Sequence, residues 1–204
     1  GETNGVEYTY RNLLSIISQN DIGMDVITYG PQDSIEWEGS VKIITHRPRV
    51  KYNLEHCFNI DLIFPYTSTA KMIRKRDYGI VHSATSDPLG GLACKLARDQ
   101  DIPFLSVYHT SVDSYVQNRI NRYVEETIGS IGEAVFRHFL KKYYNKSDLV
   151  LAPSEHTRKE ISQMLKPPVE LLSRGIDTEQ FNPKYRDREN GKVQALYVGR
   201  VSPE

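Results

Sequence analysis

A histidine placed where an apolar strand ends is the first candidate for chemistry in this sequence. His109, followed by Thr110, comes directly after the apolar run 102–108, and the polar segment 82–86 ends the preceding apolar run. Ligands of open α/β folds collect at the carboxyl ends of parallel strands. The two segments therefore predict a cleft at one edge of a sheet. A capping or core histidine explains the position of His109 alone equally well.

A glycine-containing loop at the amino end is a second candidate, for binding a phosphate. Residues 1–6 read Gly-Glu-Thr-Asn-Gly-Val and lead into a predicted helix. The unpaired amides and positive end of such a helix favour an anion. A simple turn capped by Asn4 explains the same residues. The loop lacks the Gly-Lys-Ser/Thr ending of a P-loop, and it is not a GxGxxG dinucleotide fingerprint.

Gly199 and Arg200 form a third candidate, because they follow the last apolar run, 193–198. An arginine can hold a diphosphate through two parallel hydrogen bonds, and a glycine before it lets the backbone come close. An ordinary surface arginine is the commoner explanation for this pair.

An alternation of apolar strands and amphipathic helices must position these candidates. Asp87 before Pro88, and Ser154, have the residue types of helix N-caps. No clear period runs through 46–58, so we expect a loop there, and 112–146 is predicted to be mostly helical. The apolar periods predict strands over 25–29, 41–45, 79–83, 102–108 and 148–152, and helices over 4–20 and 64–76, after Asp87 and after Ser154.

The order of these elements predicts an α/β fold, a Rossmann-like doubly wound parallel sheet. Continuous apolar strands between amphipathic helices are typical of a parallel sheet that is covered on both faces. Such a domain should open with a strand, so we expect the first strand to lie upstream of Gly1. We expect one domain over 1–182, a linker over 183–192, and the first strand of a second, truncated domain over 193–204.

Composition excludes several classes of protein. The 204 residues carry 26 Lys plus Arg and 26 Asp plus Glu, so no net charge would attract nucleic acid. No apolar run approaches the roughly 20 residues that span a bilayer. Cys57 and Cys94 lack zinc-site spacing and are expected to be reduced thiols. With no secretion signal at the amino end, the expected location is cytoplasmic.

Seven short motifs, in order and at about the right spacing, resemble the retaining GT-B glycosyltransferases of family 4. The resemblance covers nearly the whole chain. The motifs are Asn-Gly-Val at 4–6, the strand at 79–83, Asp-Pro-Leu-Gly at 87–90, Tyr-His-Thr at 108–110, Ala-Pro-Ser-Glu-His-Thr at 152–157, Arg-Gly-Ile-Asp at 174–177 with Phe-Asn-Pro at 181–183, and Tyr-Val-Gly-Arg at 197–200.

The resemblance implies an enzyme with two Rossmann-like domains that moves a hexose, with retention, from a nucleotide-diphosphate sugar to an acceptor. It implies neither a metal nor a cofactor. His109 would contact the sugar near the reacting carbon, and the amide of Gly5 would approach the donor diphosphate. Gly199 and Arg200 would bind that diphosphate and neutralise its charge as it leaves. Acceptor contacts would come from Asn4, Thr110, Ser111, Asp113 and Tyr115.

The sequence departs from the family pattern at its end. The lysine and the two glutamates that follow the Gly-Arg pair in the family are not in this sequence, so we expect the isolated chain to be inactive. Two alternatives stay open. A nucleotide-sugar epimerase has the same architecture, and a non-catalytic carbohydrate-binding module could use the same cleft.

The acceptor is expected to bind mainly to this amino-terminal domain. Local similarity of 108–115 and 143–156 to bacterial enzymes that glycosylate lipids favours a glycolipid, with possible peripheral contact at the inner membrane face. Basic and aromatic residues could form a surface for lipid. A helix whose aromatic residues partly cover the sheet is the other interpretation. The residues concerned are Arg119, Arg122, Arg137, Lys141, Lys142 and Lys146 with Tyr115, Tyr123, Phe136, Tyr143 and Tyr144.

Overall fold

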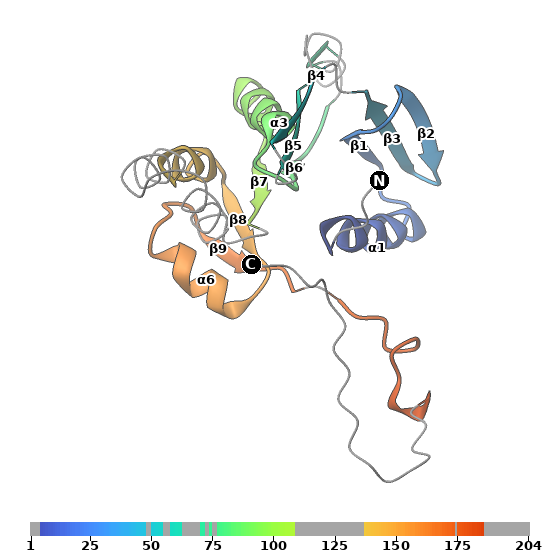
Figure 1. The fold of residues 1–204 in the computed structure, drawn as a ribbon. Coiled ribbons are helices and arrows are strands. Elements are labelled where there is room, and N and C mark those ends of the chain that lie inside the picture. Colours follow the sequence, from blue (N-terminus) through green and yellow to red (C-terminus); the bar gives the residue numbers. More distant parts are fainter. Residues whose placement is uncertain are drawn as a thin grey trace.

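The protein is a mixed α/β structure in which helices pack against β-sheets, the largest of which is parallel (Figure 1). It is described here from a computed structural model, whose described residues are 5–47, 50–54, 58–62, 70–71, 74, 77–108, 137–173 and 175–185. The predicted strand over 193–198 lies outside these residues. So do most of the predicted linker and most of the predicted helix over 112–146.

The larger sheet has four strands, all parallel, in the order β6-β7-β8-β9. Its strands are β6 (Val81–Ser83), β7 (Phe104–Val107), β8 (Leu149–Ala152) and β9 (Val169–Leu171). This order confirms the predicted parallel sheet. Strand β9 was not predicted, because it is only three residues long and follows directly on Pro168.

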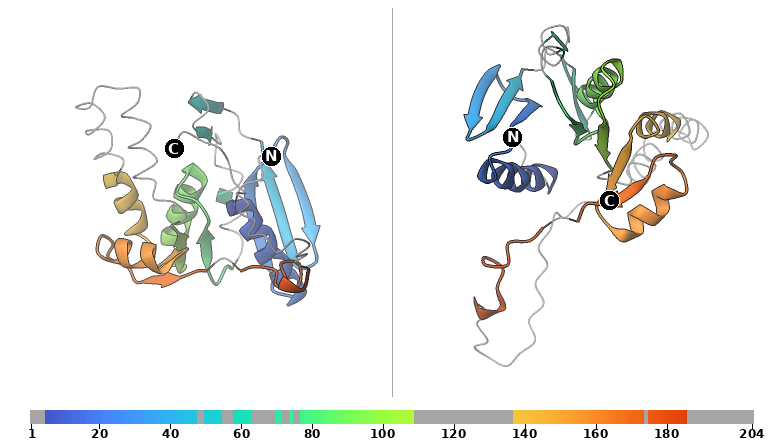
Figure 2. Two further views of the ribbon diagram at one scale, coloured as in Figure 1. Left: turned by 60° about the horizontal axis from the view of Figure 1, so that its bottom comes forward. Right: turned by 180° about the vertical axis from the view of Figure 1, so that it is seen from behind.

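The two helices expected to begin at capped positions do so. Helix α3 (Pro88–Asp99) begins after Asp87, whose carboxylate accepts a hydrogen bond from the Gly90 amide at 2.8 Å. Helix α6 (Glu155–Ser162) begins after Ser154, whose hydroxyl accepts one from the Thr157 amide at 3.2 Å. Helices α3 and α6 and the helical segment 137–144 cover the same face of the larger sheet (Figures 1 and 2).

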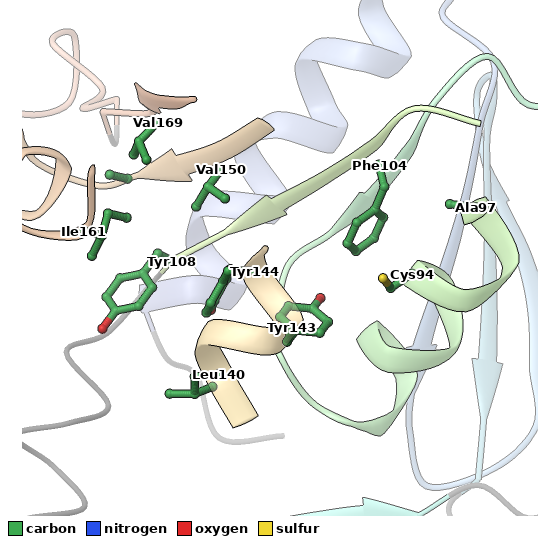
Figure 3. Packing of buried hydrophobic residues seen from close by; sticks show 11 residues of the cluster. Cys94, Ala97, Phe104, Tyr108, Leu140, Tyr143, Tyr144, Val150, Ile161 and Val169 are labelled. Carbon is green, nitrogen blue, oxygen red and sulfur yellow. The ribbon is translucent and has the colours of Figure 1, made fainter. Parts of the chain in front are cut away.

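The core lies between these helices and the larger sheet (Figure 3). Phe104 and Val150 are fully buried in its middle strands. Cys94 reaches the core from α3 and Ile161 from α6. Burying this face of the sheet removes the largest connected apolar surface of the described chain from water. The cluster consists of Cys94, Ala97, Phe104, Tyr108, Leu140, Tyr143, Tyr144, Val150, Ala152, Ile161 and Val169.

A smaller sheet lies nearer the amino end and has the order β1-β3-β2. Strands β1 (Met24–Tyr29) and β3 (Val41–His46) are parallel, whereas β2 (Ser34–Glu38) runs antiparallel to β3. Helix α1 (Gly5–Gln19) packs beside this sheet, which confirms the predicted first helix (Figure 1).

The prediction of a loop over 46–58 was wrong. Strand β4 (Val50–Leu54) pairs antiparallel with β5 (Phe58–Leu62) in a separate two-stranded sheet. Neither β4 nor β5 has an alternating apolar pattern in its sequence. Each is a strand because its backbone pairs with the other. A single 3-10 turn, η1 (Pro183–Tyr185), falls within the predicted linker.

Candidate functional site

The carboxyl ends of the larger sheet form an edge that we call the carboxyl rim, made of residues 84–87, Tyr108 and 153–154. Parallel strands end on the same side of a sheet, so the segments that follow β6, β7 and β8 meet there. The Tyr108 amide donates to the carbonyl oxygen of Leu151 at 2.8 Å, which extends the ladder by one residue beyond β7. Tyr108 is therefore fixed at the rim, directly before His109 in sequence.

Helix α1 runs opposite to the strands of the smaller sheet. Near its end, the Ser18 hydroxyl donates at 3.0 Å to the carbonyl oxygen of Glu38, the last residue of β2 before the turn into β3. The 13 residues back to Gly5 rise about 20 Å, close to the length of a six-residue strand. Gly5 consequently lies at the level where β1 and β3 end.

Two side-chain contacts fix the smaller sheet and α1 against β6. The Tyr78 hydroxyl, just before β6, donates to the Asp25 carboxylate near the start of β1 at 2.6 Å. Further along β6, His82 Nε2 lies 2.6 Å from the hydroxyl of Tyr10, which is in the amino-terminal half of α1. Helix α1 therefore runs opposite to β6, as it does to the strands of the smaller sheet. Gly5 and the carboxyl rim thus lie on the same side of the molecule.

His82 lies within β6 and contacts α1. Its ring and that of Tyr10 are 5.7 Å apart between centroids and tilted by 57°. Burial lowers the pKa of the His82 imidazole, so the ring is neutral at pH 7. Burial also raises the pKa of the Tyr10 phenol, which stays protonated. This neutral pair joins α1 to the larger sheet.

The rim segment after β6 is held by close backbone packing against α3. The Ser83 hydroxyl donates to the Thr85 carbonyl oxygen at 2.8 Å. A Cβ at Gly90 would lie 2.6 Å from Ser83 Oγ and 2.9 Å from the Tyr143 hydroxyl, and it would also clash with the Thr85 carbonyl. Glycine at position 90 therefore lets the first turn of α3 approach the rim.

A small cavity of about 90 Å³ lies beside Tyr108. Its floor is apolar, and Arg137 and Lys141 stand one helical turn apart among its lining residues. Ligand pockets of whole proteins usually measure about 300–1,000 Å³, so this cavity does not hold a nucleotide sugar by itself. The remaining lining residues are Leu140, Tyr144, Met164 and Leu165.

Of the residues predicted for the site, the structure describes Gly5. It places Gly5 at the amino end of α1, on the side of the carboxyl rim. The other predicted residues lie outside the described part of the chain, so their roles remain predictions. They are Asn4, His109, Thr110, Ser111, Asp113, Tyr115, Gly199 and Arg200.

The described part of the helix within 112–146 distinguishes the two interpretations of its aromatic residues. Tyr143 and Tyr144 are buried in the core, as in the interpretation that aromatic residues of this helix cover the sheet. The spacing of Ile128, Ile131, Val135 and Phe139 predicts one apolar stripe on this helix, yet Phe139 is 57% exposed. The buried residues Leu140, Tyr143 and Tyr144 share helical spacing, and this signal was available in the sequence. In residues 137–144, the buried face therefore includes Leu140 and not Phe139.

Two kinds of feature are absent from the described residues. Within them, His, Cys, Asp and Glu form no group of three or more that could hold a metal ion. None of their helices is long and apolar enough to cross a membrane.

Comparison with known proteins places these features in a family. The family described as Glycosyltransferase Family 4 matches residues 3–180. A GDP-mannose-dependent alpha-mannosyltransferase of Corynebacterium glutamicum is 26% identical over 211 aligned positions, covering 98% of this chain and 49% of that protein. One of the same description from Mycobacterium tuberculosis is 28% identical over 141, covering 66% and 35%.

A third relative is described as a lipid synthase. The alpha-monoglucosyldiacylglycerol synthase of Streptococcus pneumoniae is 24% identical over 135 positions, covering 66% of this chain and 29% of that protein. The chain spans about half the length, or less, of these curated relatives.

Proposed function

Because the chain belongs to glycosyltransferase family 4, we propose that it forms the acceptor-side half of an enzyme that transfers a sugar from a nucleotide-diphosphate sugar. The observation that carries this proposal is the common side shared by Gly5 and the carboxyl rim. A helix amino end and a sheet edge that face one side can bind a diphosphate and a sugar acceptor next to each other.

The proposed roles follow the order of these segments. The Gly5 amide approaches the diphosphate, and His109 contacts the sugar near its reacting carbon. Gly199 and Arg200, in the second domain, neutralise the leaving diphosphate, since stabilising developing charge is the main task in such a reaction. Asn4, Thr110, Ser111, Asp113 and Tyr115 contact the acceptor. The reaction retains the anomeric configuration and needs no metal.

The relatives suggest which substrates to try first. Two are described as GDP-mannose-dependent, so GDP-mannose is the first donor, with UDP-glucose as the comparison. A third is described as a diacylglycerol-lipid synthase, which supports a lipid acceptor and peripheral contact with a membrane. We therefore propose a glycolipid or diacylglycerol acceptor, reached from the cytoplasmic face of the membrane.

The decisive experiment uses the complete protein that contains this chain. Purified enzyme is incubated with radiolabelled GDP-mannose or UDP-glucose and with lipid acceptors in vesicles. We expect labelled glycolipid with a retained anomeric configuration, unchanged by a chelator. His109→Ala should abolish transfer, and the 204-residue chain alone should show none.

Other outcomes identify the alternative functions. Conversion or hydrolysis of the donor with no transfer to any acceptor would indicate an epimerase. Binding of free sugar without nucleotide would indicate a carbohydrate-binding module.

For membrane contact, we expect co-sedimentation with anionic vesicles that weakens as salt is added. No binding at low salt would remove that part of the proposal.

A further inference from the structure

Two adjacent tyrosines of segment 137–144 reach the two rim segments that border the candidate site. Tyr143 and Tyr144 are both buried, and both present hydroxyls to the carboxyl rim. Buried tyrosine hydroxyls usually find hydrogen-bond partners, so the identity of those partners shows what each tyrosine positions.

Tyr143 holds the segment after β6. Its hydroxyl donates to Ser83 Oγ at 2.9 Å, and Ser83 Oγ in turn donates to the Thr85 carbonyl oxygen at 2.8 Å. The Tyr143 hydroxyl is also 3.3 Å from that carbonyl. These hydrogen bonds end at the Thr85 carbonyl oxygen in the carboxyl rim. They can form there because Gly90 has no side chain to occupy the same space.

Tyr144 holds the segment after β7. Its hydroxyl donates to the Val107 carbonyl oxygen over 3.4 Å, the last residue of β7. Burial raises the pKa of Tyr144 to about 12, and a side-chain hydrogen bond with Ser86 opposes that rise. Tyr144 therefore contacts both rim segments, since Ser86 belongs to the one after β6.

The rings of these tyrosines belong to a continuous aromatic stack under β7 (Figure 3). Tyr143 lies 6.1 Å from Phe104 and 5.1 Å from Tyr144, and Tyr144 lies 5.3 Å from Tyr108, all between ring centroids. Edge and tilted ring pairs at these distances are favourable and restrict ring orientation. The stack connects the start of β7 to Tyr108, the residue bonded to His109.

We infer that Tyr143 and Tyr144 are positioning residues that clamp the segment after β6 to the end of β7 at a fixed separation, and so fix Tyr108, the residue that precedes His109 in the sequence. The inference rests on the proposed function. A positioning error of about 1 Å can lower a rate by about 100-fold. The backbone pairing of β6 with β7 ends at Ser83 and Ser106. Beyond Ser83, no backbone hydrogen bond among the described residues joins the two segments, and the tyrosines join them instead.

The test uses Tyr143→Phe and Tyr144→Phe in the complete protein. Each change removes one hydroxyl and keeps the ring stack. Ser147→Ala is the matched control, because the Ser106 and Ser147 hydroxyls form an equally buried hydrogen bond of 2.7 Å that touches no rim segment. All three variants should unfold at similar urea concentrations.

We expect kcat to fall about tenfold or more in both tyrosine variants. The control should keep its kcat, and the KM for the nucleotide sugar should change little in all three proteins. The clamp is overturned if the tyrosine variants and Ser147→Ala lose activity equally. Equal losses would mean that the hydroxyls act through stability alone.

Amide hydrogen exchange separates failure of the clamp from failure of the proposed function. If the wild-type protein transfers no sugar, the proposed function fails, and exchange over 83–87 and 105–108 decides the clamp. We expect faster exchange over 83–87 in Tyr143→Phe and over both segments in Tyr144→Phe. Unchanged exchange at both segments, or an equal increase in Ser147→Ala, would reject the clamp.

Discussion

The larger and smaller sheets both contain parallel strands, but they are covered very differently. The β6–β9 sheet has α3, α6 and segment 137–144 packed on one face, and this face contains the main buried cluster (Figure 1). In the described part of the smaller sheet and α1, Val41 and Ile44 are the buried residues. On β2 the side chains of Ile35 and Trp37 are about 60% exposed.

This difference indicates that the larger sheet stabilises the fold, whereas the smaller sheet positions part of the candidate site. Removal of apolar surface from water is the main favourable term in folding, so the β6–β9 layer supplies most of the stability of the described chain. The smaller sheet supports α1 and thereby the position of Gly5. We expect substitutions in the larger sheet to unfold the protein, and substitutions at the contacts between the sheets to change their alignment.

The largest expected effect comes from emptying the core of the larger sheet. Phe104 is 0% exposed, so Phe104→Ala should lower the free energy of unfolding by about 3–5 kcal/mol. The matched change in the smaller sheet is Ile35→Ala, which should cost within about 0.5 kcal/mol. Urea unfolding followed by circular dichroism measures both. Similar losses for the two variants would contradict the contrast between the sheets.

A smaller effect is expected at the first turn of α3, where two neighbouring glycines differ. Gly90→Ala should destabilise by about 1–3 kcal/mol, because the new methyl group meets Ser83 and Thr85 at the rim. A Cβ at Gly91 meets no atom within 4 Å, so Gly91→Ala should stabilise the helix by about 0.5–1 kcal/mol. Thermal unfolding of the two variants tests this. Shifts of the same sign would show that the close approach at Gly90 is not tight.

The smallest effect concerns the contact between the two regions and depends on pH. Because the pKa of His82 is lowered in the fold, its contribution to stability is complete above the unfolded value of about 6.5. That contribution is lost as the pH falls from there through the lower folded-state pKa. His82→Gln should remove this part of the pH dependence. Urea unfolding at pH 7.5 and 5.5 gives the loss of unfolding free energy between these pH values for the wild type and for His82→Gln. An equal loss in the two proteins would refute the prediction.

The larger sheet could be predicted from sequence because its signals are local. Asp87, Pro88 and Ser154 mark helix starts through their own side chains and backbones, and the short apolar runs of β7 and β8 indicate strands between those helices. These features need no knowledge of distant partners. The family motifs fall mostly in the same region, since they follow its strands.

The elements that were missed depend on a partner. Strand β2 is mostly exposed and is defined by its antiparallel pairing with β3, and β4 is defined in the same way by β5. Edge and hairpin strands of this kind carry little pattern of their own. The contact between Tyr10 and His82 joins residues 72 positions apart, and residue spacing cannot reveal such a pair.

The placement of Cys94 beneath α3 gives the molecule an internal chemical reporter. The thiol is 3% exposed, and burial raises its pKa, so it is both shielded and mostly protonated. A maleimide can react with it only after α3 has separated from β6 and β7. In a Cys57→Ser background, the rate of alkylation would therefore measure how often this layer opens under native conditions, without any denaturant.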